Sequence, residues 1–157
     1  MTTSPPPVAL ATGDEMPTSQ FGPLTRSHIV RYAGSGGDFN PIHHDEEFAR
    51  AAGMPGVFGM GLLHGGVLAQ RLTAWVGLAN IRSFRIRFTG QVWPGDLLSF
   101  GGRVTGVREA GGQQVADLEL VVTRQTADEH GLRSLEDLAP LCADMTFAGA
   151  PEFQERS

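Results

Sequence analysis

The second half of the chain alternates apolar and polar residues, and this pattern constrains the fold more than any other feature. Apolar residues lie on one parity in four stretches: Phe84, Ile86 and Phe88; Leu98, Phe100 and Val104; Ala116, Leu118, Leu120 and Val122; Leu141, Ala143, Met145 and Phe147. Such alternation is typical of antiparallel strands with one face on a core. Gly111-Gly112 predicts a hairpin turn, and residues 126–139 predict a long connection.

The first half predicts helices. Thr25 is a candidate N-cap of a short helix that stops at Gly34, and Asp45 is a candidate N-cap of a second helix ending at Gly53. Residues 59–77 predict a longer, mostly buried helix, in which Gly65 and Gly66 favour the close approach of another backbone. The predicted fold class is therefore α+β, with a long central helix wrapped by an antiparallel sheet.

Length and composition narrow the classes of protein. The 157 residues predict one domain over 13–151, with a disordered arm over 1–12 and a tail over 152–157. A net charge of −5 argues against nucleic-acid binding, and the single cysteine, Cys142, excludes an internal disulfide and multi-cysteine metal sites. Without an apolar run of about 18 residues or a secretory signal, we expect no membrane insertion and a cytoplasmic location.

Asp38, Asn40 and His43 form the most informative cluster of polar residues. Pro41 and the neighbouring glycines argue against a helix there, and a turn around Asn40-Pro41 could bring the Asp38 carboxylate and the His43 imidazole together. Such a pair is a candidate general acid–base unit. The alternative is a purely structural turn in which Asp38 accepts a local hydrogen bond. No third ligand accompanies His43 and His44, so we expect no metal site.

Three segments resemble one known family. The run YAGSGGDFNPIH from Tyr32 to His43, followed by Ala49, is similar to the hydratase motif of the MaoC-like dehydratases, also called (R)-specific enoyl-CoA hydratases. The run GLLHGG over 61–66 resembles the start of that family's central helix. Residues 86–89 and 92–96 resemble its strand and turn, so the resemblance covers about residues 13–125. Many members have His-Gly-Met where this chain has Met60-Gly61-Leu62, which keeps the glycine.

The resemblance implies a hot dog fold, usually dimeric, and a reaction without cofactor or metal. Water would add reversibly to a trans-2-enoyl thioester, giving the (R)-3-hydroxyacyl thioester. Asp38 and His43 match the family's catalytic pair, which holds one water, and Asn40 would hold the loop or position that water. The backbone N–H of Gly61 would bind the thioester oxygen, which suits the partial positive charge of a helix N-terminus.

Other substrate contacts are less constrained by the sequence. His64 is either packed or in contact with substrate. Arg85 and Arg87 lie on the polar face of a predicted strand, where they are either solvated or bound to the phosphates of a CoA carrier, with Arg103 and Arg124 as further candidates. The expected substrate is an acyl-CoA, or the same acyl group on an acyl carrier protein.

Two other functions remain open. A thioester hydrolase on the same fold would need a carboxylate on the central helix, and the sequence has no Asp or Glu between Glu47 and Asp96. The chain could instead be one half of a heterodimeric dehydratase rather than a homodimer, and the complete set of Asp38, Asn40 and His43 favours the active half. The sequence leaves the acyl group itself open.

Overall fold

The structure is a computed structural model that describes residues 8–127 and, for the backbone alone, 141–148. Five strands form one antiparallel sheet in the order β1-β3-β4-β5-β2. The strands are β1 (Glu15–Phe21), β2 (Ile81–Phe84), β3 (Leu97–Ala110), β4 (Gln113–Gln125) and β5 (Leu141–Ala148). The helices are α1 (Arg26–Gly36), η1 (Pro41–His43), α2 (Glu46–Ala51), α3 (Gly61–Val76) and η2 (Leu78–Asn80).

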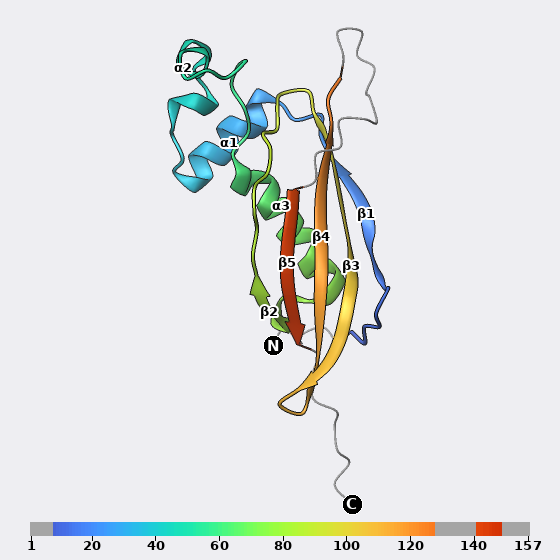
Figure 1. Cartoon of the computed structure of the whole chain (residues 1–157). Helices are drawn as coiled ribbons and strands as arrows, with labels where there is room; N and C mark the ends of the chain where they lie inside the picture. Colours follow the sequence, from blue (N-terminus) through green and yellow to red (C-terminus); the bar gives the residue numbers. More distant parts are fainter. Residues whose placement is uncertain (1–7, 128–140, 149–157) are drawn as a thin grey trace, which may run out of the picture.

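The long helix α3 lies across one face of the sheet, while α1, η1 and α2 gather at one end of it (Figure 1). The buried core joins the apolar face of α3 to the inward parity of β3 and β4. It includes Leu68, Leu72 and Val76 from the helix, and Leu98, Phe100, Leu118, Leu120 and Val122 from the strands. The α+β prediction is confirmed, and so are the inward parities of β3 and β4, because these apolar residues can leave water only by facing α3.

The hairpin between β3 and β4 is also confirmed, since Gly111 and Gly112 both have positive φ (63° and 75°). β5 occupies the predicted fourth stretch. Residues 128–140 of the predicted connection lie outside the described residues, as do residues 1–7 of the predicted arm and the predicted tail. The side chain of Cys142 lies outside them too. Within the predicted arm, Leu10 packs against the core.

Two strand predictions need correction. β1 was not predicted, because only Met16 of this edge strand is fully buried and its pairing with β3 is interrupted by a bulge. The predicted strand over Phe84–Phe88 is wrong beyond Phe84, where β2 ends. After Phe84 the chain leaves the sheet, and the side chains of Ile86 and Phe88 pack against the first turns of α3.

The first helix begins where it was predicted and ends later. At its start the Thr25 hydroxyl accepts a hydrogen bond from the His28 N–H, and the Thr25 N–H donates one to His28 Nδ1. The predicted stop at Gly34 is wrong: α1 runs on to Gly36. The helix ends at Gly37, whose φ of 71° is the left-handed conformation typical of a helix C-terminus.

The helix α2 is capped by Asp45, as predicted, and is bound to α1 by an ion pair. Arg26 donates a hydrogen bond of 2.6 Å to Glu46, which also lies 3.3 Å from Arg50. The hydrogen bond from Arg26 is the main reason why the pKa of Glu46 lies below its usual value. This contact holds α2 close to the start of α1, and both helices border the loop that carries Asp38 and His43.

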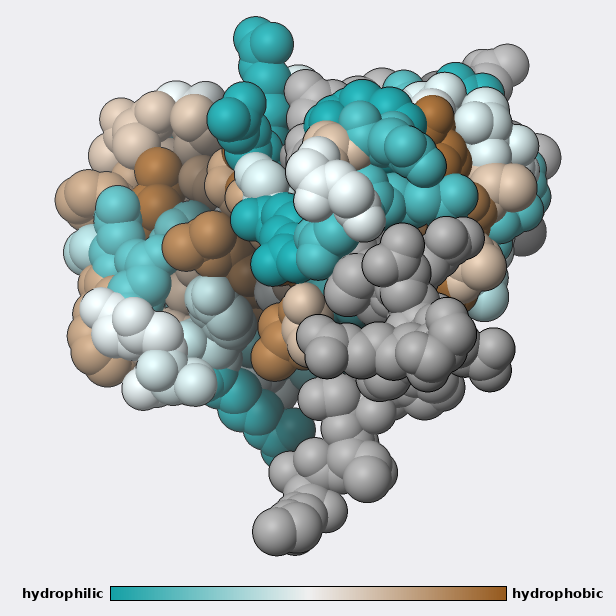
Figure 2. All heavy atoms as spheres, turned by 90° about the horizontal axis from the view of Figure 1, so that it is seen from below, coloured by the Kyte–Doolittle hydropathy of each residue, from teal (hydrophilic) through white to brown (hydrophobic). Residues whose placement is uncertain are grey.

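Large apolar side chains are exposed on the helical part of the molecule. They are Val30, Phe39, Phe48, Leu62, Leu78 and Phe88, and none of them belongs to a strand. Figure 2 shows hydrophobic patches on the side where the helices lie in Figure 1 (left in both views). Within the part of the chain that the structure describes, no helix has the length and apolar character needed to cross a membrane.

Candidate active site

The loop between α1 and η1 brings Asp38 and His43 together. Asn40 organises its turn, because its Oδ1 accepts a hydrogen bond from the Ile42 N–H (3.1 Å) and its own N–H lies 3.4 Å from Asp38 Oδ1. The chain therefore folds back on itself at Pro41. As a result, His43 Nε2 lies 3.8 Å from Asp38 Oδ2.

A backbone carbonyl fixes the orientation of His43. Its Nδ1 lies 2.8 Å from the carbonyl oxygen of Phe58, which can only accept, so Nδ1 carries the proton. In the neutral ring, the lone pair is then on Nε2, the atom that faces Asp38. The Phe58 ring meets the imidazole edge-on at 5.0 Å between centroids and is itself in edge contact with Trp93 at 5.6 Å. Sequence reasoning did not find Phe58, because a carbonyl acceptor carries no side-chain signal.

Both side chains open into a cavity of about 410 Å³ at the N-terminus of α3. Its wall consists of Asp38, His43, Phe58, Gly59, Met60, Gly61, Leu62, His64, Phe88, Thr89, Gly90 and Gln91. Met60 is the N-cap of α3 and offers no side-chain hydrogen bond. The first N–H of α3, that of Gly61, therefore has no partner among the described residues and lies at the cavity wall.

Phe88 covers the first turn of α3. A Cβ on Gly61 would lie 2.9 Å from three atoms of the Phe88 ring, so any larger residue there would force the ring to shift. The same ring meets His64 edge-on, with 5.6 Å between centroids. Phe88 is nevertheless 42 % exposed, which places it at the cavity mouth. It was not predicted as a site residue, because its alternation with Arg87 was interpreted as that of a strand.

His64 is the second histidine of the cavity wall and is only 2 % exposed. Its Nε2 is buried and has no hydrogen-bond partner among the described residues. Desolvation lowers the pKa of His64 to about 4, so the imidazole is neutral at neutral pH. The sequence left two interpretations of His64: packing inside the protein or contact with substrate. The structure shows a buried side chain that also lines the cavity.

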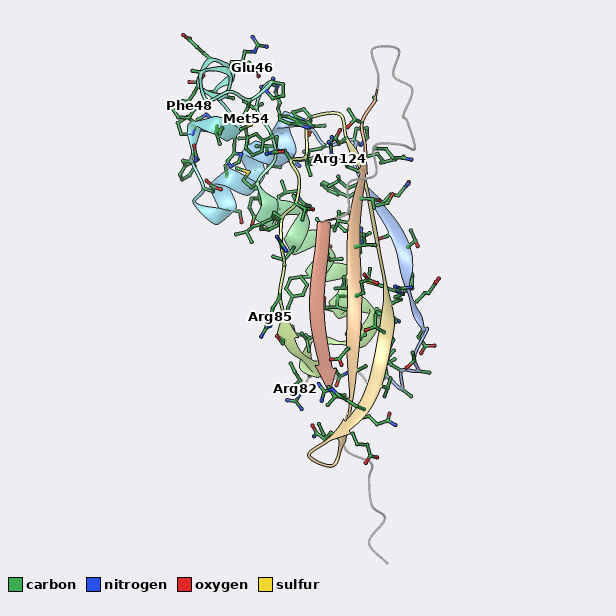
Figure 3. The ribbon with its side chains drawn as sticks, in the orientation of Figure 1. Glu46, Phe48, Met54, Arg82, Arg85 and Arg124 are labelled. Atoms are coloured by element: carbon green, nitrogen blue, oxygen red, sulfur yellow. The ribbon has the colours of Figure 1, made fainter. Side chains whose placement is uncertain are left out.

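The arginines proposed to meet a carrier lie outside the cavity wall. Arg85 and Arg87 are exposed and follow β2, and Figure 3 shows Arg85 pointing away from the fold at that edge. Arg103 pairs with Glu119 at 2.8 Å, and Arg124 lies 3.5 Å from the buried Asp96. Among the described residues, no group of three or more His, Cys, Asp or Glu side chains could hold a metal ion.

Comparison with known proteins identifies the family of the chain. A family model described as a MaoC like domain matches residues 8–128. The 3-hydroxyacyl-thioester dehydratase Y of Mycobacterium tuberculosis is 37 % identical over 97 residues, which are 59 % of this chain and 33 % of that protein. The beta subunit of the 3-oxo-4,17-pregnadiene-20-carboxyl-CoA hydratase of the same organism is 30 % identical over 109 residues, covering 69 % of this chain and 81 % of the relative.

A solved structure gives the same answer for the fold. The (R)-hydratase from A. caviae superimposes with a TM-score of 0.67 at 21 % identity, over 88 % of this chain and 96 % of that one. The chain spans a third or less of the length of the first curated relatives that it matches. Because the family model covers most of the chain and the hot dog architecture agrees with it, the chain belongs to the MaoC-like dehydratase family.

Proposed function

We propose that this protein adds water reversibly to a trans-2-enoyl thioester and forms the (R)-3-hydroxyacyl thioester. One observation carries the proposal: the Asp38 carboxylate and His43 Nε2 face each other at 3.8 Å in a cavity that also contains the free N–H of Gly61. This separation is too long for a direct hydrogen bond. It allows one water molecule to lie within hydrogen-bond distance of both groups.

The reaction needs one group to remove a proton and one to supply a proton. As the water oxygen attacks C3, an O–H bond breaks and its proton passes to one member of the pair, while the electron pair of the double bond moves toward the thioester oxygen. The other member then gives a proton to C2. His43 presents a lone pair at Nε2 because its Nδ1–H is bound to the Phe58 carbonyl, and Asp38 is the second proton carrier.

The thioester oxygen gains negative charge during this reaction and needs a donor. The N–H of Gly61 is proposed for this role, because the N-terminus of α3 adds partial positive charge there. Asn40 acts indirectly: it holds the turn between Asp38 and His43 through the Ile42 N–H. Arg85 and Arg87 are proposed to meet the phosphates of a carrier outside the cavity, where both are exposed.

The proposed substrate is an acyl-CoA, or the same acyl group on an acyl carrier protein. The names of two relatives, a 3-hydroxyacyl-thioester dehydratase and a carboxyl-CoA hydratase, support a thioester. One relative is named as the beta subunit of a hydratase, which indicates an assembly of different subunits in that protein. We propose that the chain works as a dimer with a second copy or with a related subunit.

The test is hydration of trans-2-enoyl-CoAs of graded length and bulk, followed by the loss of enoyl thioester absorbance. Asp38→Asn and His43→Gln are each expected to lower kcat by about 10²–10⁴-fold, because each removes one proton carrier. His44→Gln is the matched control, since His44 is exposed and lies outside the cavity wall.

Two further readouts complete this experiment. Gel filtration of the purified chain establishes whether the assayed species is a dimer, and thermal unfolding establishes that the variants are folded. Full activity in both folded variants would rule out this pair. Release of free CoA without 3-hydroxyacyl-CoA would instead identify a thioester hydrolase.

A further inference from the structure

His64 is a buried polar side chain whose Nε2 lacks a partner. Most buried polar atoms in proteins are hydrogen-bonded, and leaving one unpaired destabilises the folded state. Asp96, the other buried polar residue of the described chain, follows that rule and accepts hydrogen bonds from Trp93 and Thr126. His64 does not, although its ring lies beside a cavity. An unpaired buried nitrogen destabilises the fold, so its presence in a residue of the cavity wall points to a ligand that would pair with it.

The position of His64 on α3 indicates which part of a ligand it would meet. Helical side chains lean toward the N-terminus of their helix, so the His64 ring extends back over the turn that begins at Gly61. Phe88 confirms that the two positions are adjacent, because its ring contacts both Gly61 and His64. Gly61 and His64 therefore line one wall of the cavity, and the Nε2 atom is covered by its neighbours in that wall, so a ligand reaches it only after a side chain of the wall moves.

The charge state of the ring fits a donor rather than a proton carrier. Burial keeps His64 neutral at neutral pH, and the positive end of the α3 dipole also disfavours an imidazolium there. A neutral imidazole with its proton on Nε2 offers one N–H donor and no charge that needs compensation in the resting enzyme. Asp38 and His43 are the other titratable side chains of the cavity wall and already form the proton-carrying pair.

We propose that His64 donates a hydrogen bond from Nε2–H to the thioester carbonyl oxygen of the substrate, beside the hydrogen bond from the Gly61 N–H. This inference rests on the proposed hydration. When water adds to C3, the electron pair of the double bond moves to this oxygen and forms an enolate, which both donors stabilise. The pair returns as C2 takes up its proton, so His64 neither gains nor loses a proton over the cycle.

The test uses three substitutions at one position. His64→Gln keeps an N–H donor near the place of Nε2, His64→Asn places its amide nearer to Nδ1, and His64→Leu removes the donor. The substrate is a straight-chain trans-2-enoyl-CoA that the wild-type chain hydrates, because the only oxygen of its acyl group is the thioester oxygen. We expect kcat to fall by about 10²–10³-fold in the Leu and Asn variants and by much less in the Gln variant.

Stability supplies a readout of opposite sign. His64→Leu is expected to raise the midpoint of thermal unfolding, because it removes an unpaired buried nitrogen from a helix, while it lowers kcat. A structural role for His64 predicts the reverse: lower stability and unchanged kcat. The pH profile of kcat in the Gln variant is expected to keep its wild-type shape, since His64 carries no proton in the reaction.

Three results would overturn the proposal. They are an unchanged kcat in His64→Leu, a rise in KM alone, or equal loss in the Gln and Asn variants. If the Leu variant does not fold, the Gln and Asn pair still decides the matter. If the wild-type chain hydrates no enoyl-CoA, the proposed function fails, whereas a wild-type chain that works beside an equally active Leu variant refutes the role of His64 alone.

Discussion

The two histidines of the cavity are held in opposite ways. The His43 ring is bonded through Nδ1 to the Phe58 carbonyl, and its other nitrogen faces Asp38. His64 has a buried Nε2 with no described partner, and burial lowers its pKa to about 4. One ring therefore turns a free nitrogen toward a carboxylate, and the other is kept neutral.

The lowered pKa of His64 predicts how stability depends on pH. An unfolded chain protonates this histidine near pH 6.5, whereas the folded chain does so only near pH 4. Between these values the unfolded state binds the extra proton, so stability is full above pH 6.5 and is lost as the pH falls. From pH 7 to pH 5 this loss amounts to about 2 kcal/mol.

Urea unfolding of the wild type and of His64→Leu at pH 7 and pH 5 measures this effect. The wild type is expected to lose more stability on acidification than the variant, and His44→Gln is expected to behave like the wild type. Parallel losses in the wild type and His64→Leu would show that the folded state protonates His64 normally.

At the residue scale, the side chains of the candidate site could be predicted from the sequence, but the groups that surround them could not. Asp38, Asn40 and His43 could be predicted because they lie close together in the chain and their turn has a local signal at Pro41. The Phe58 carbonyl and the Phe88 ring could not, because each reaches the site through folding of distant segments. The roles of Asp38, His43, Asn40, Gly61, Arg85 and Arg87 stay predictions until they are measured.

At the scale of elements, two adjacent glycines of α3, Gly65 and Gly66, have different surroundings. A Cβ on Gly65 would lie 2.8 Å from the Ile86 side chain, whereas a Cβ on Gly66 would meet no atom within 4 Å. The predicted close approach of another backbone is therefore wrong at both positions: the near neighbour of Gly65 is a side chain, and Gly66 is exposed.

This difference predicts opposite outcomes for two equal substitutions. Gly66→Ala is expected to stabilise the protein by up to about 1 kcal/mol, because alanine favours a helix without a clash. Gly65→Ala gains the same propensity but must displace Ile86, so its net gain is expected to be smaller or negative. Chemical denaturation of both variants checks the order, and equal stabilisation would mean that Ile86 yields freely.

The strands show where the alternation of apolar and polar residues is sufficient to predict an element. β3 and β4 are long and central, so each inward residue is apolar and the pattern predicts them well. β1 is an edge strand with little burial and left no such pattern. The segment after β2 kept the alternation of a strand because Ile86 and Phe88 face α3, although no described strand pairs with them. Alternating hydrophobicity therefore shows which side chains face the core. It does not show that a segment pairs with another strand.

At the scale of the whole molecule, Asp96 joins segments that are far apart in the sequence. Its carboxylate, which is fully buried, accepts hydrogen bonds from the Trp93 N–H and the Thr126 hydroxyl and lies 3.5 Å from Arg124. The carbonyl of the same residue accepts a hydrogen bond from the Leu24 N–H. Asp96 therefore connects the turn before β3, the end of β4 and the chain that enters α1.

Removal of this carboxylate is expected to act on the fold and on the cavity together. Asp96→Ala leaves Arg124, itself partly buried, without its counter-charge, and should lower the free energy of unfolding by about 3–5 kcal/mol. Glu119→Gln is the matched control: it breaks the exposed pair with Arg103, which is expected to change stability by less than about 1 kcal/mol.

Urea unfolding and enoyl-CoA hydration, measured on the same preparations, separate this effect from that of the proposed pair of Asp38 and His43. The segment before Asp96 supplies Phe88 and Gln91 to the cavity, and the Val92 carbonyl binds the Gly59 N–H just before α3. Asp96→Ala should therefore lose activity and stability together, whereas Asp38→Asn should lose activity alone. If Asp96→Ala were as stable as Glu119→Gln, this buried carboxylate would not be what joins the turn before β3 to the end of β4, and the cavity wall would depend on the apolar core and the backbone hydrogen bonds.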